Sequence, residues 1–312
     1  MKIHISNNWC NTEQFFVYKL LKKYFNNDVE LTSDPINCDI FIHSVFGNDD
    51  YYKTTKAKFK IFCLWETRFY LDIAKERIQY SDLSLTYMPT EGKNIRFPLW
   101  YMWIDWWNEN GGDEVTVVCG QSHHYIGKNT LKDEWVPTIN NIKTNIYTSG
   151  SVWNRNKFCS MLVGNCEESS VKVRSEIFNE VSKNIEPVFG MGLAFGKRFE
   201  GNKIDLLTNF KFNLCYENSV HEGYVSEKLF DAKFAGCIPL YYGDPIYSQK
   251  DFNKNSFLNR LDYSNNTDYI KEIKKLNSDK EYFISKCNEP LFTEDKFPSL
   301  DFFYEKFDEV FK

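Results

Sequence analysis

The sequence predicts an α/β protein built on doubly wound parallel sheets, and three observations lead to this fold class. Residues 210–244 change from strand periodicity to helical spacing and then to a short apolar strand, which makes a βαβ unit. Several other short apolar runs are separated by helical or loop segments, as in a doubly wound sheet. The chain has 312 residues, enough for two α/β domains of ordinary size or for one large one.

The first hundred residues predict four strands and one helix. The strands are expected at residues 2–7, 39–45, 58–64 and 81–87. A helix is expected to begin at Thr12, because Phe16, Leu20 and Tyr24 recur on one helical face.

Two features of the first half stand out beside these elements. Glu66 follows the strand 58–64 directly, so its carboxylate is expected at the carboxyl end of that strand, where a solvated ion pair is its alternative role. The segment Arg96-Phe97-Pro98-Leu99 leads into a tryptophan-rich run at 100–107. Its tryptophans are candidates for lining a binding cleft, although core packing explains them equally well.

Between residues 111 and 151 the pattern is weaker. A strand at 115–119 and mixed helical spacing at 131–146 are the expected elements. Asparagine, threonine, serine and glycine gather at 145–151, so we expect a domain boundary there.

The second half repeats the alternation of strands and helices. Residues 156–163 predict a strand that ends in Gly164-Asn165, and a helix from about Val171 carries Arg174, for which a surface position is the alternative. Gly236 is expected to end the helix of the βαβ unit, and Thr267 to cap the next helix. The remaining strands are expected at 187–190, 210–216 and 238–242, and the helices from about 225 and at 268–276, 280–286 and 302–311.

Composition and charge exclude several classes of protein. The net charge is −5, which argues against the broad basic face of a nucleic-acid-binding protein. No apolar run approaches the roughly 18 residues of a membrane span, and no signal peptide is recognisable at the N-terminus. The nine cysteines are scattered without a CxxC pair, which favours reduced thiols in a cytoplasmic protein, with the inner membrane surface as a further location.

Aromatic residues make up 17% of the chain, which fits core packing or, alternatively, stacking on sugar rings. No metal centre is predicted, because the chain has no Asp-x-Asp pair and the adjacent His123 and His124 are expected in a surface loop.

Candidate binding residues gather where the strand 210–216 ends and the following helix begins. In an open α/β sheet, ligands bind outside the carboxyl ends of the strands. The residues there offer acceptors for sugar hydroxyls, an aromatic face, a cation and helix N-terminal amides that favour a phosphate. They are Glu217, Asn218, Tyr224, Ser226, Glu227 and Lys228.

The run FKFNLCYENSVHEGYVSEKLFDAKFAGCIPLYYGD, from Phe210 to Asp244, resembles the donor-site signature of the family-10 glycosyltransferases, the α-1,3/4-fucosyltransferases. It departs from the signature at Tyr216, where the family has Phe, and at Ser226, where it has Thr. The first half is similar in its order of motifs, with Glu66 followed by Ser81-Asp82 and then by the segment 96–99. Trp65 and Thr67 replace the family's Gly and Asn beside Glu66.

This resemblance implies the GT-B architecture, in which two Rossmann-like domains face a cleft. The expected domains are an acceptor-binding domain at 1–150, a GDP-fucose-binding domain at 151–290 and a final helix within 291–312 that packs back on the first domain. The chain looks like the soluble bacterial type of the family.

The resemblance also implies roles for individual residues. Glu66 is expected to be the catalytic base, and Arg174 with Lys228 to hold the departing diphosphate. The residues expected to orient ribose, guanine and fucose are Glu227, Asn218 and Tyr224, and Asn165 and Glu217 are further candidates for the donor site. Trp100, Trp103 and Trp106 are the weak candidates for acceptor binding.

The implied reaction is the transfer of fucose, with inversion, from GDP-fucose to an N-acetyllactosamine-type glycan or glycolipid. No cofactor is expected, although stimulation by Mn²⁺ or Mg²⁺ stays open, as does peripheral contact with a membrane through a lipid-linked acceptor. The alternatives are a GT-B enzyme that uses another nucleotide sugar and an inactive module that binds GDP or glycans. A nucleic-acid-binding or scaffold protein ranks last because of the charge.

Overall fold

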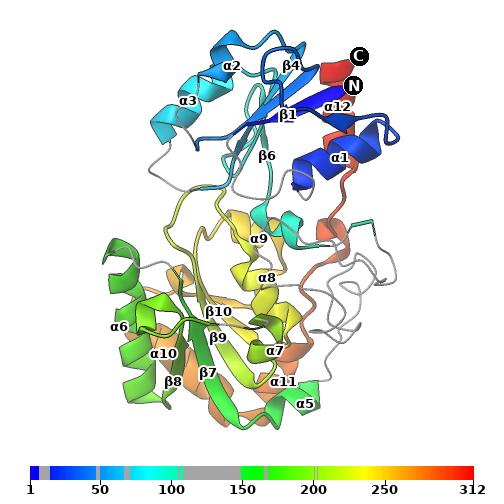
Figure 1. Ribbon diagram of the computed structural model, residues 1–312. Coiled ribbons are helices and arrows are strands. Elements are labelled where there is room, and N and C mark those ends of the chain that lie inside the picture. Colours follow the sequence, from blue (N-terminus) through cyan, green and yellow to red (C-terminus); the bar gives the residue numbers. More distant parts are fainter. Residues whose placement is uncertain are drawn as a thin grey trace.

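The structure is a computed structural model that describes residues 1–6, 15–46, 50–66, 71–104, 106–107, 149–164, 168–199, 201 and 203–312. It contains two parallel sheets, one in each half of the chain (Figure 1).

The N-terminal sheet has six strands in the order β2-β1-β3-β4-β5-β6, and each neighbouring pair is parallel. Its strands are β1 (Lys2–Ile5), β2 (Glu30–Leu31), β3 (Ile40–His43), β4 (Phe59–Leu64), β5 (Leu83–Thr86) and β6 (Asn94–Arg96). Helix α1 (Phe16–Tyr24) lies on one face of this sheet, and α2 (Tyr51–Thr54) and α3 (Leu71–Gln79) lie on the other (Figure 1). A 3-10 helix, η3 (Leu99–Trp103), follows β6.

The C-terminal sheet has five strands in the order β11-β10-β9-β7-β8, again all parallel. Its strands are β7 (Lys157–Leu162), β8 (Val188–Met191), β9 (Phe210–Tyr216), β10 (Ile238–Tyr242) and β11 (Leu258–Asn259). The α-helices of this half are α5 (Ser149–Trp153), α6 (Glu168–Asn184), α7 (Lys203–Leu207), α8 (Glu227–Phe234), α9 (Tyr247–Asp251), α10 (Asn266–Ser278), α11 (Lys280–Asn288) and α12 (Asp301–Phe311). The 3-10 helices are η6 (Leu193–Phe195), η7 (Lys254–Ser256), η8 (Arg260–Asp262) and η9 (Glu294–Lys296).

Both sheets place their first strand between their second and third strands, so both are doubly wound. The predicted α/β fold class, with two Rossmann-like domains, is confirmed. The order of the strands reverses between β1 and β3 in the first domain and between β7 and β9 in the second. Ligands bind at such switch points in this kind of fold, outside the carboxyl ends of the strands.

The strand predicted at 210–216 is confirmed as β9, but it has no solvent-facing side. Asn213 and Cys215 are as buried as the aromatic residues that alternate with them. The amide of Asn213 donates to the backbone oxygen and to Oγ of Ser160 on β7, at 3.1 and 2.9 Å. A central parallel strand is covered on both faces, so its polar residues need partners inside the protein.

The ends of two helices test the capping residues that the sequence predicted. Gly236 follows α8 with φ +81°, as the prediction of a C-terminal glycine requires. The prediction that Thr267 caps α10 is wrong, because Asn265 has the extended backbone of an N-cap and accepts from the Asp268 amide at 2.9 Å. The predicted helix start at Thr12, the elements at 115–119 and 131–146, and His123-His124 lie outside the described residues.

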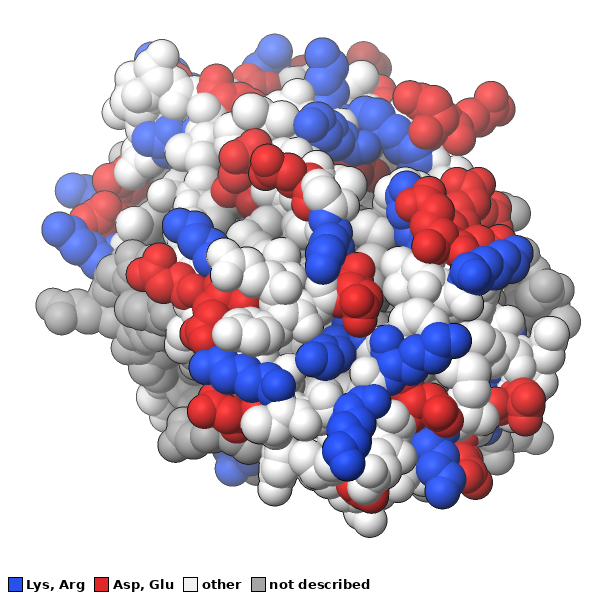
Figure 2. Space-filling view, turned by 90° about the horizontal axis from the view of Figure 1, so that it is seen from above, with Lys and Arg blue, Asp and Glu red and all other residues white. Residues whose placement is uncertain are grey.

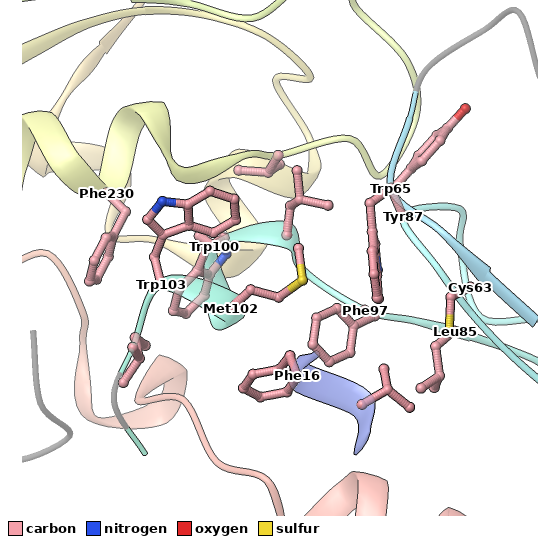
Figure 3. Close-up of a cluster of buried hydrophobic side chains, with 14 of the residues drawn as sticks. Phe16, Cys63, Trp65, Leu85, Tyr87, Phe97, Trp100, Met102, Trp103 and Phe230 are labelled. Carbon is pink, nitrogen blue, oxygen red and sulfur yellow. The ribbon is translucent and has the colours of Figure 1, made fainter. Parts of the chain in front are cut away.

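One hydrophobic cluster contains residues of both domains, and the second domain has a further cluster of its own. Trp100, on η3, packs with ring-centroid distances of 5.8 Å to Phe230, 4.8 Å to Phe252 and 5.3 Å to Phe292. Figure 3 shows this tryptophan beside Phe230 of α8, with Phe97 and Phe16 of the first domain farther along the same cluster. The segment after β6 therefore anchors the first domain in the second.

The last helix, α12, contacts the first helix of the chain. The hydroxyl of Tyr24 donates to Asp308 at 2.6 Å, and the Tyr24 ring lies 5.4 Å from that of Phe307. The ring of Phe311 lies 4.8 Å from Phe59 on β4. The two termini accordingly lie close together (Figure 1).

Among the described residues, no helix combines the length and the apolar composition that a membrane span requires. The six cysteines that the structure describes are free thiols, and five of them are buried. On the face shown in Figure 2, positive and negative side chains are interspersed rather than gathered by sign.

Candidate active site

The candidate site lies at the switch point of the second sheet, where β9 ends and the donor loop, residues 217–226, begins. Glu217 opens this loop and is 2% exposed. Its carboxylate accepts from the Ser226 amide at 2.8 Å and from the Ser226 hydroxyl at 2.9 and 2.7 Å. Tyr241 and Lys228 donate to it as well, at 3.2 and 3.0 Å. Glu217 therefore ties the first residue of the donor loop to the last one.

Arg174 reaches the same place from α6 and is 4% exposed, so the surface position that the sequence left open is wrong. Its Nη2 donates to the Tyr216 carbonyl at 2.9 Å and to Oδ1 of Asn218 at 2.7 Å. Its Nε and Nη1 are buried and have no hydrogen-bond partner among the described residues. Burial lowers the pKa of Arg174, against the opposing effect of Glu217 and Tyr224. A buried cation with unused donors favours an anionic ligand at this position.

The N-terminus of α8 supplies the second cation. Ser226 caps this helix, and Nζ of Lys228 donates to Oγ of Ser226 and to Glu217, both at 3.0 Å. Glu227 is held from the other side, because Nζ of Lys203 lies 3.7 Å from its carboxylate and 2.7 Å from that of Asp231. Burial lowers the pKa of Lys203, but Asp231 and Glu227 more than offset this, so the pKa is raised and the lysine keeps its charge.

Tyr224 connects this site to the first domain. It is 3% exposed, and its ring stands at 84° to the Tyr87 ring, 5.3 Å away. Burial raises the pKa of Tyr224 well above its ordinary value, and the carboxylates of Glu217, Glu227 and Glu66 raise it further. Glu66, which follows β4 of the first domain, therefore acts electrostatically on a tyrosine of the donor loop in the second domain.

The middle of the donor loop is fixed at Gly223. Its amide donates to Asp244 at 2.6 Å, and its carbonyl accepts from Nε of Arg96 at 3.0 Å. The residue has φ +82°, and a Cβ there would meet the Tyr87 carbonyl oxygen at 2.2 Å. Only glycine fits this close approach of the two domains.

Residues 152–286 match the family described as glycosyltransferase family 10 (fucosyltransferase), C-terminal part. The chain carries a family-10 glycosyltransferase domain. The resemblance predicted from the run 210–244 is thereby confirmed.

Two relatives illustrate how far this likeness extends. The α-(1,3)-fucosyltransferase FucT of Helicobacter pylori is 40% identical over 124 residues, which are 38% of this chain and 25% of that protein. The 4-galactosyl-N-acetylglucosaminide 3-α-L-fucosyltransferase 9 of Bos taurus is 28% identical over 219 residues, 68% of this chain and 58% of that protein. The chain thus spans between about a quarter and three fifths of the length of these relatives.

Solved structures share the fold of this chain. A crystal structure of α1,3-fucosyltransferase with GDP-fucose has a TM-score of 0.65 at 23% identity and covers 100% of this chain and 90% of its own. Anabaena Alr3699/HepE in complex with UDP and glucose has a TM-score of 0.54 at 8% identity, covering 100% of this chain and 99% of its own. The predicted GT-B architecture is confirmed.

Most of the predicted donor residues of this family-10 domain come together in the structure. Arg174 is bonded to Asn218, and Lys228 pairs with Glu217. The charges of Glu217, Glu227, Glu66 and Arg174 all act on Tyr224. Asn165 lies outside the described residues. Glu217 was a further candidate for the donor site. Its carboxylate is buried and already bonded to the protein, which suits a structural support better than a contact with the donor.

The three tryptophans predicted to line a cleft are packed in the core. Trp100, Trp103 and Trp106 are 1%, 5% and 8% exposed. The indole nitrogen of Trp100 donates to Asp251 and that of Trp106 to the Tyr101 carbonyl, at 3.1 and 2.8 Å. Core packing, the alternative that the sequence left open, is what the structure shows, and we do not assign these rings to the acceptor.

Sequence reasoning missed the residues that hold the site from outside. Arg96 stands in a segment that the sequence singled out, but its partners Asp251 and Gly223 lie 155 and 127 residues away. Lys203, which pairs with both Glu227 and Asp231, also carried no local signal. Among the described residues, no group of three or more His, Cys, Asp or Glu side chains is arranged to hold a metal ion.

Proposed function

We propose that this chain is an inverting α-1,3-fucosyltransferase, which moves L-fucose from GDP-fucose to a hydroxyl of GlcNAc or Glc in an N-acetyllactosamine-type glycan. The observation that carries the proposal is the pair of cations at the end of β9: Arg174, with two buried nitrogens that have no partner among the described residues, and Lys228 at the N-terminus of α8. Glu66, from the first domain, acts electrostatically on Tyr224 of the same loop. The family match supports the reaction class, and the names of the relatives support the sugar and the linkage.

In this mechanism Glu66 is the general base. Its carboxylate takes the proton of the acceptor hydroxyl while that oxygen attacks C1 of fucose from the face opposite the phosphate. The bond between C1 and the phosphate oxygen breaks in the same step, so the configuration at C1 inverts. GDP leaves with the electron pair of that bond.

The leaving group gains negative charge as it departs, and the two cations stand where this charge develops. Arg174 has free N–H donors, and Lys228 is held by Glu217 and Ser226 at the N-terminus of α8. Fixed charges of this kind stabilise a transition state without reorganising. We propose that they make a divalent cation unnecessary, with Glu227, Asn218 and Tyr224 orienting the nucleoside and the fucose.

The alternative donor is another nucleotide sugar, because HepE, with UDP and glucose bound, shares the fold. An inactive module that binds GDP or glycans is the alternative to an enzyme. One experiment distinguishes these two alternatives from the proposed fucosyltransferase.

The experiment measures GDP release with GDP-fucose and N-acetyllactosamine, in the presence of EDTA, for the wild type, Glu66→Gln and Glu91→Gln. Glu91 is an exposed glutamate of the same domain and serves as the matched control. We expect Glu66→Gln to lose about 10²–10⁴-fold in kcat while its affinity for GDP is kept. Glu91→Gln should behave as the wild type.

Each other outcome removes one part of the proposal. Equal turnover by Glu66→Gln assigns the base elsewhere, and turnover only with UDP-glucose replaces the donor. GDP binding without turnover by the wild type, with a panel of glycan acceptors, favours the inactive module. Loss of activity in EDTA that Mn²⁺ restores contradicts metal independence.

A further inference from the structure

The structure joins the donor loop to the opposite domain through one arginine. We propose that Arg96 is a positioning residue, which holds the middle of the donor loop against the first domain and so sets the approach of Glu66 to the bound donor. The inference rests on the proposed function for its catalytic consequence, but the contact itself can be tested without catalysis.

The first link is a buried ion pair between the domains. Nη1 and Nη2 of Arg96 donate to the two carboxylate oxygens of Asp251, on α9, both at 2.7 Å. The side chains of the pair are 10% and 7% exposed. Trp100 donates to the same carboxylate at 3.1 Å, and the guanidinium lies 4.6 Å from the centre of the Tyr247 ring. A bidentate pair fixes the orientation of both groups as well as their distance.

The second link runs from the same guanidinium to the donor loop. Nε of Arg96 donates to the Gly223 carbonyl at 3.0 Å, while Asp244 accepts from the Gly223 amide at 2.6 Å. Arg96 of the first domain therefore holds the carbonyl of Gly223, and Asp244 of the second domain holds its amide. Tyr224 follows directly, in contact with Tyr87.

The ends and the middle of the donor loop are held by different residues. Its two ends are tied within the second domain, where Glu217 accepts from the Ser226 amide and Arg174 donates to Asn218. Arg96 holds only the middle, which faces the first domain. Removing Arg96 should leave the groups proposed to bind the nucleotide in place. The middle of the loop should then shift relative to β5, and the distance from Glu66 to the donor should change.

Lysine is the informative substitution, because it keeps the charge but not the shape. One ammonium cannot serve both carboxylate oxygens of Asp251 and the Gly223 carbonyl in the geometry of the planar fork. Arg155→Lys is the matched control. That arginine also links elements through two carbonyls, donating to Phe210 at 2.7 Å and to Ala235 at 2.9 Å, but it does so entirely within the second domain.

The test compares Arg96→Lys, Arg155→Lys and the wild type by kcat with GDP-fucose, by GDP affinity, and by hydrogen–deuterium exchange of the peptide that covers 217–226. For Arg96→Lys we expect a loss of about 10²-fold in kcat, as for a displacement of about 1 Å at a reacting centre. GDP affinity should stay close to that of the wild type, and exchange in the peptide should rise. Arg155→Lys should change neither kcat nor this exchange.

Unchanged exchange in a folded Arg96→Lys overturns the proposal, as does unchanged kcat. A parallel loss of kcat and of GDP affinity also overturns it, since Arg96 would then build the donor site itself. If Arg96→Lys does not fold, Asp251→Asn weakens the same pair and should shift both readouts in the same direction by less. If the wild type transfers no fucose, the proposed function fails, and exchange alone decides whether Arg96 holds the loop.

Discussion

Glu217 and Arg174 lie side by side and show two different uses of a buried charge. Every oxygen of Glu217 accepts a hydrogen bond from the protein, so its charge supports the loop that surrounds it. Arg174 keeps two buried nitrogens without a partner among the described residues, so its charge is available to a ligand. Sequence position alone assigns both residues to the donor, and only their hydrogen bonds separate the support from the binding group.

A third buried charge, Lys233, predicts how stability depends on pH. Its ammonium donates to the Cys287 carbonyl at 2.9 Å, and burial lowers its pKa from 10.5 to about 8. Between about pH 8 and 10.5 the unfolded chain therefore binds more protons at this lysine than the folded protein does. The contribution of Lys233 to stability must rise with pH across this window, by a few kcal/mol in total.

Lys233→Met should remove this dependence. We expect the difference in unfolding free energy between Lys233→Met and the wild type to favour the variant most at pH 7 and to shrink as the pH approaches 10.5. Urea denaturation at pH 7, 8.5 and 10 measures the difference, with Lys280→Met, an exposed lysine, as control. A difference that does not vary with pH would mean that Lys233 is not destabilised by burial.

At the scale of elements, the turn at Gly223 decides how the donor loop meets β5. Gly223→Ala would place a Cβ 2.2 Å from the Tyr87 carbonyl oxygen at φ +82°. Left-handed strain and overpacking both act there, so we expect a loss of about 3 kcal/mol or more in stability together with a fall in the proposed fucosyl transfer.

Gly92→Ala separates these two causes. Gly92 also has a positive φ, +56°, but a Cβ there would meet nothing within 4 Å. Its substitution should cost about 1 kcal/mol and leave the transfer rate unchanged. Thermal or urea denaturation of both variants checks the costs, and equal losses would contradict a steric contact between the domains.

The βαβ unit was predictable because its signals are local. Strand periodicity at 210–216, the glycine at 236 and the apolar run at 238–242 each depend on a few neighbouring residues, and β9, α8 and β10 follow them closely. The role of Glu66 follows only from a resemblance in the order of motifs and stays a prediction. The contacts that hold Gly223 were not predictable, because those with Tyr87 and Arg96 join residues more than a hundred positions apart. The cap of α10 was missed although it is local, since Asn265 and Thr267 are both good capping residues.

At the scale of the whole molecule, a hydrophobic cluster continues from the first domain into the second. Aromatic residues of η3 pack among those of α8, while α12 returns from the second domain to the first. Two domains with a small polar interface are free to move relative to each other. Here the buried Arg96–Asp251 pair and the packing of Trp100 link the domains instead, which suits the proposed reaction, whose base and donor site lie in different domains.

The return of α12 predicts that the end of the chain stabilises its beginning. Phe307 is fully buried against Tyr24, and Phe302, on the same helix, is 42% exposed. Phe307→Ala should lower the unfolding free energy by about 3–5 kcal/mol through the cavity that it leaves, whereas Phe302→Ala should change it by less than about 0.5 kcal/mol. Urea unfolding followed by tryptophan fluorescence measures both. Because the shared core couples the domains, Phe307→Ala should shift a single transition, and a separate early transition would show that the first domain unfolds on its own.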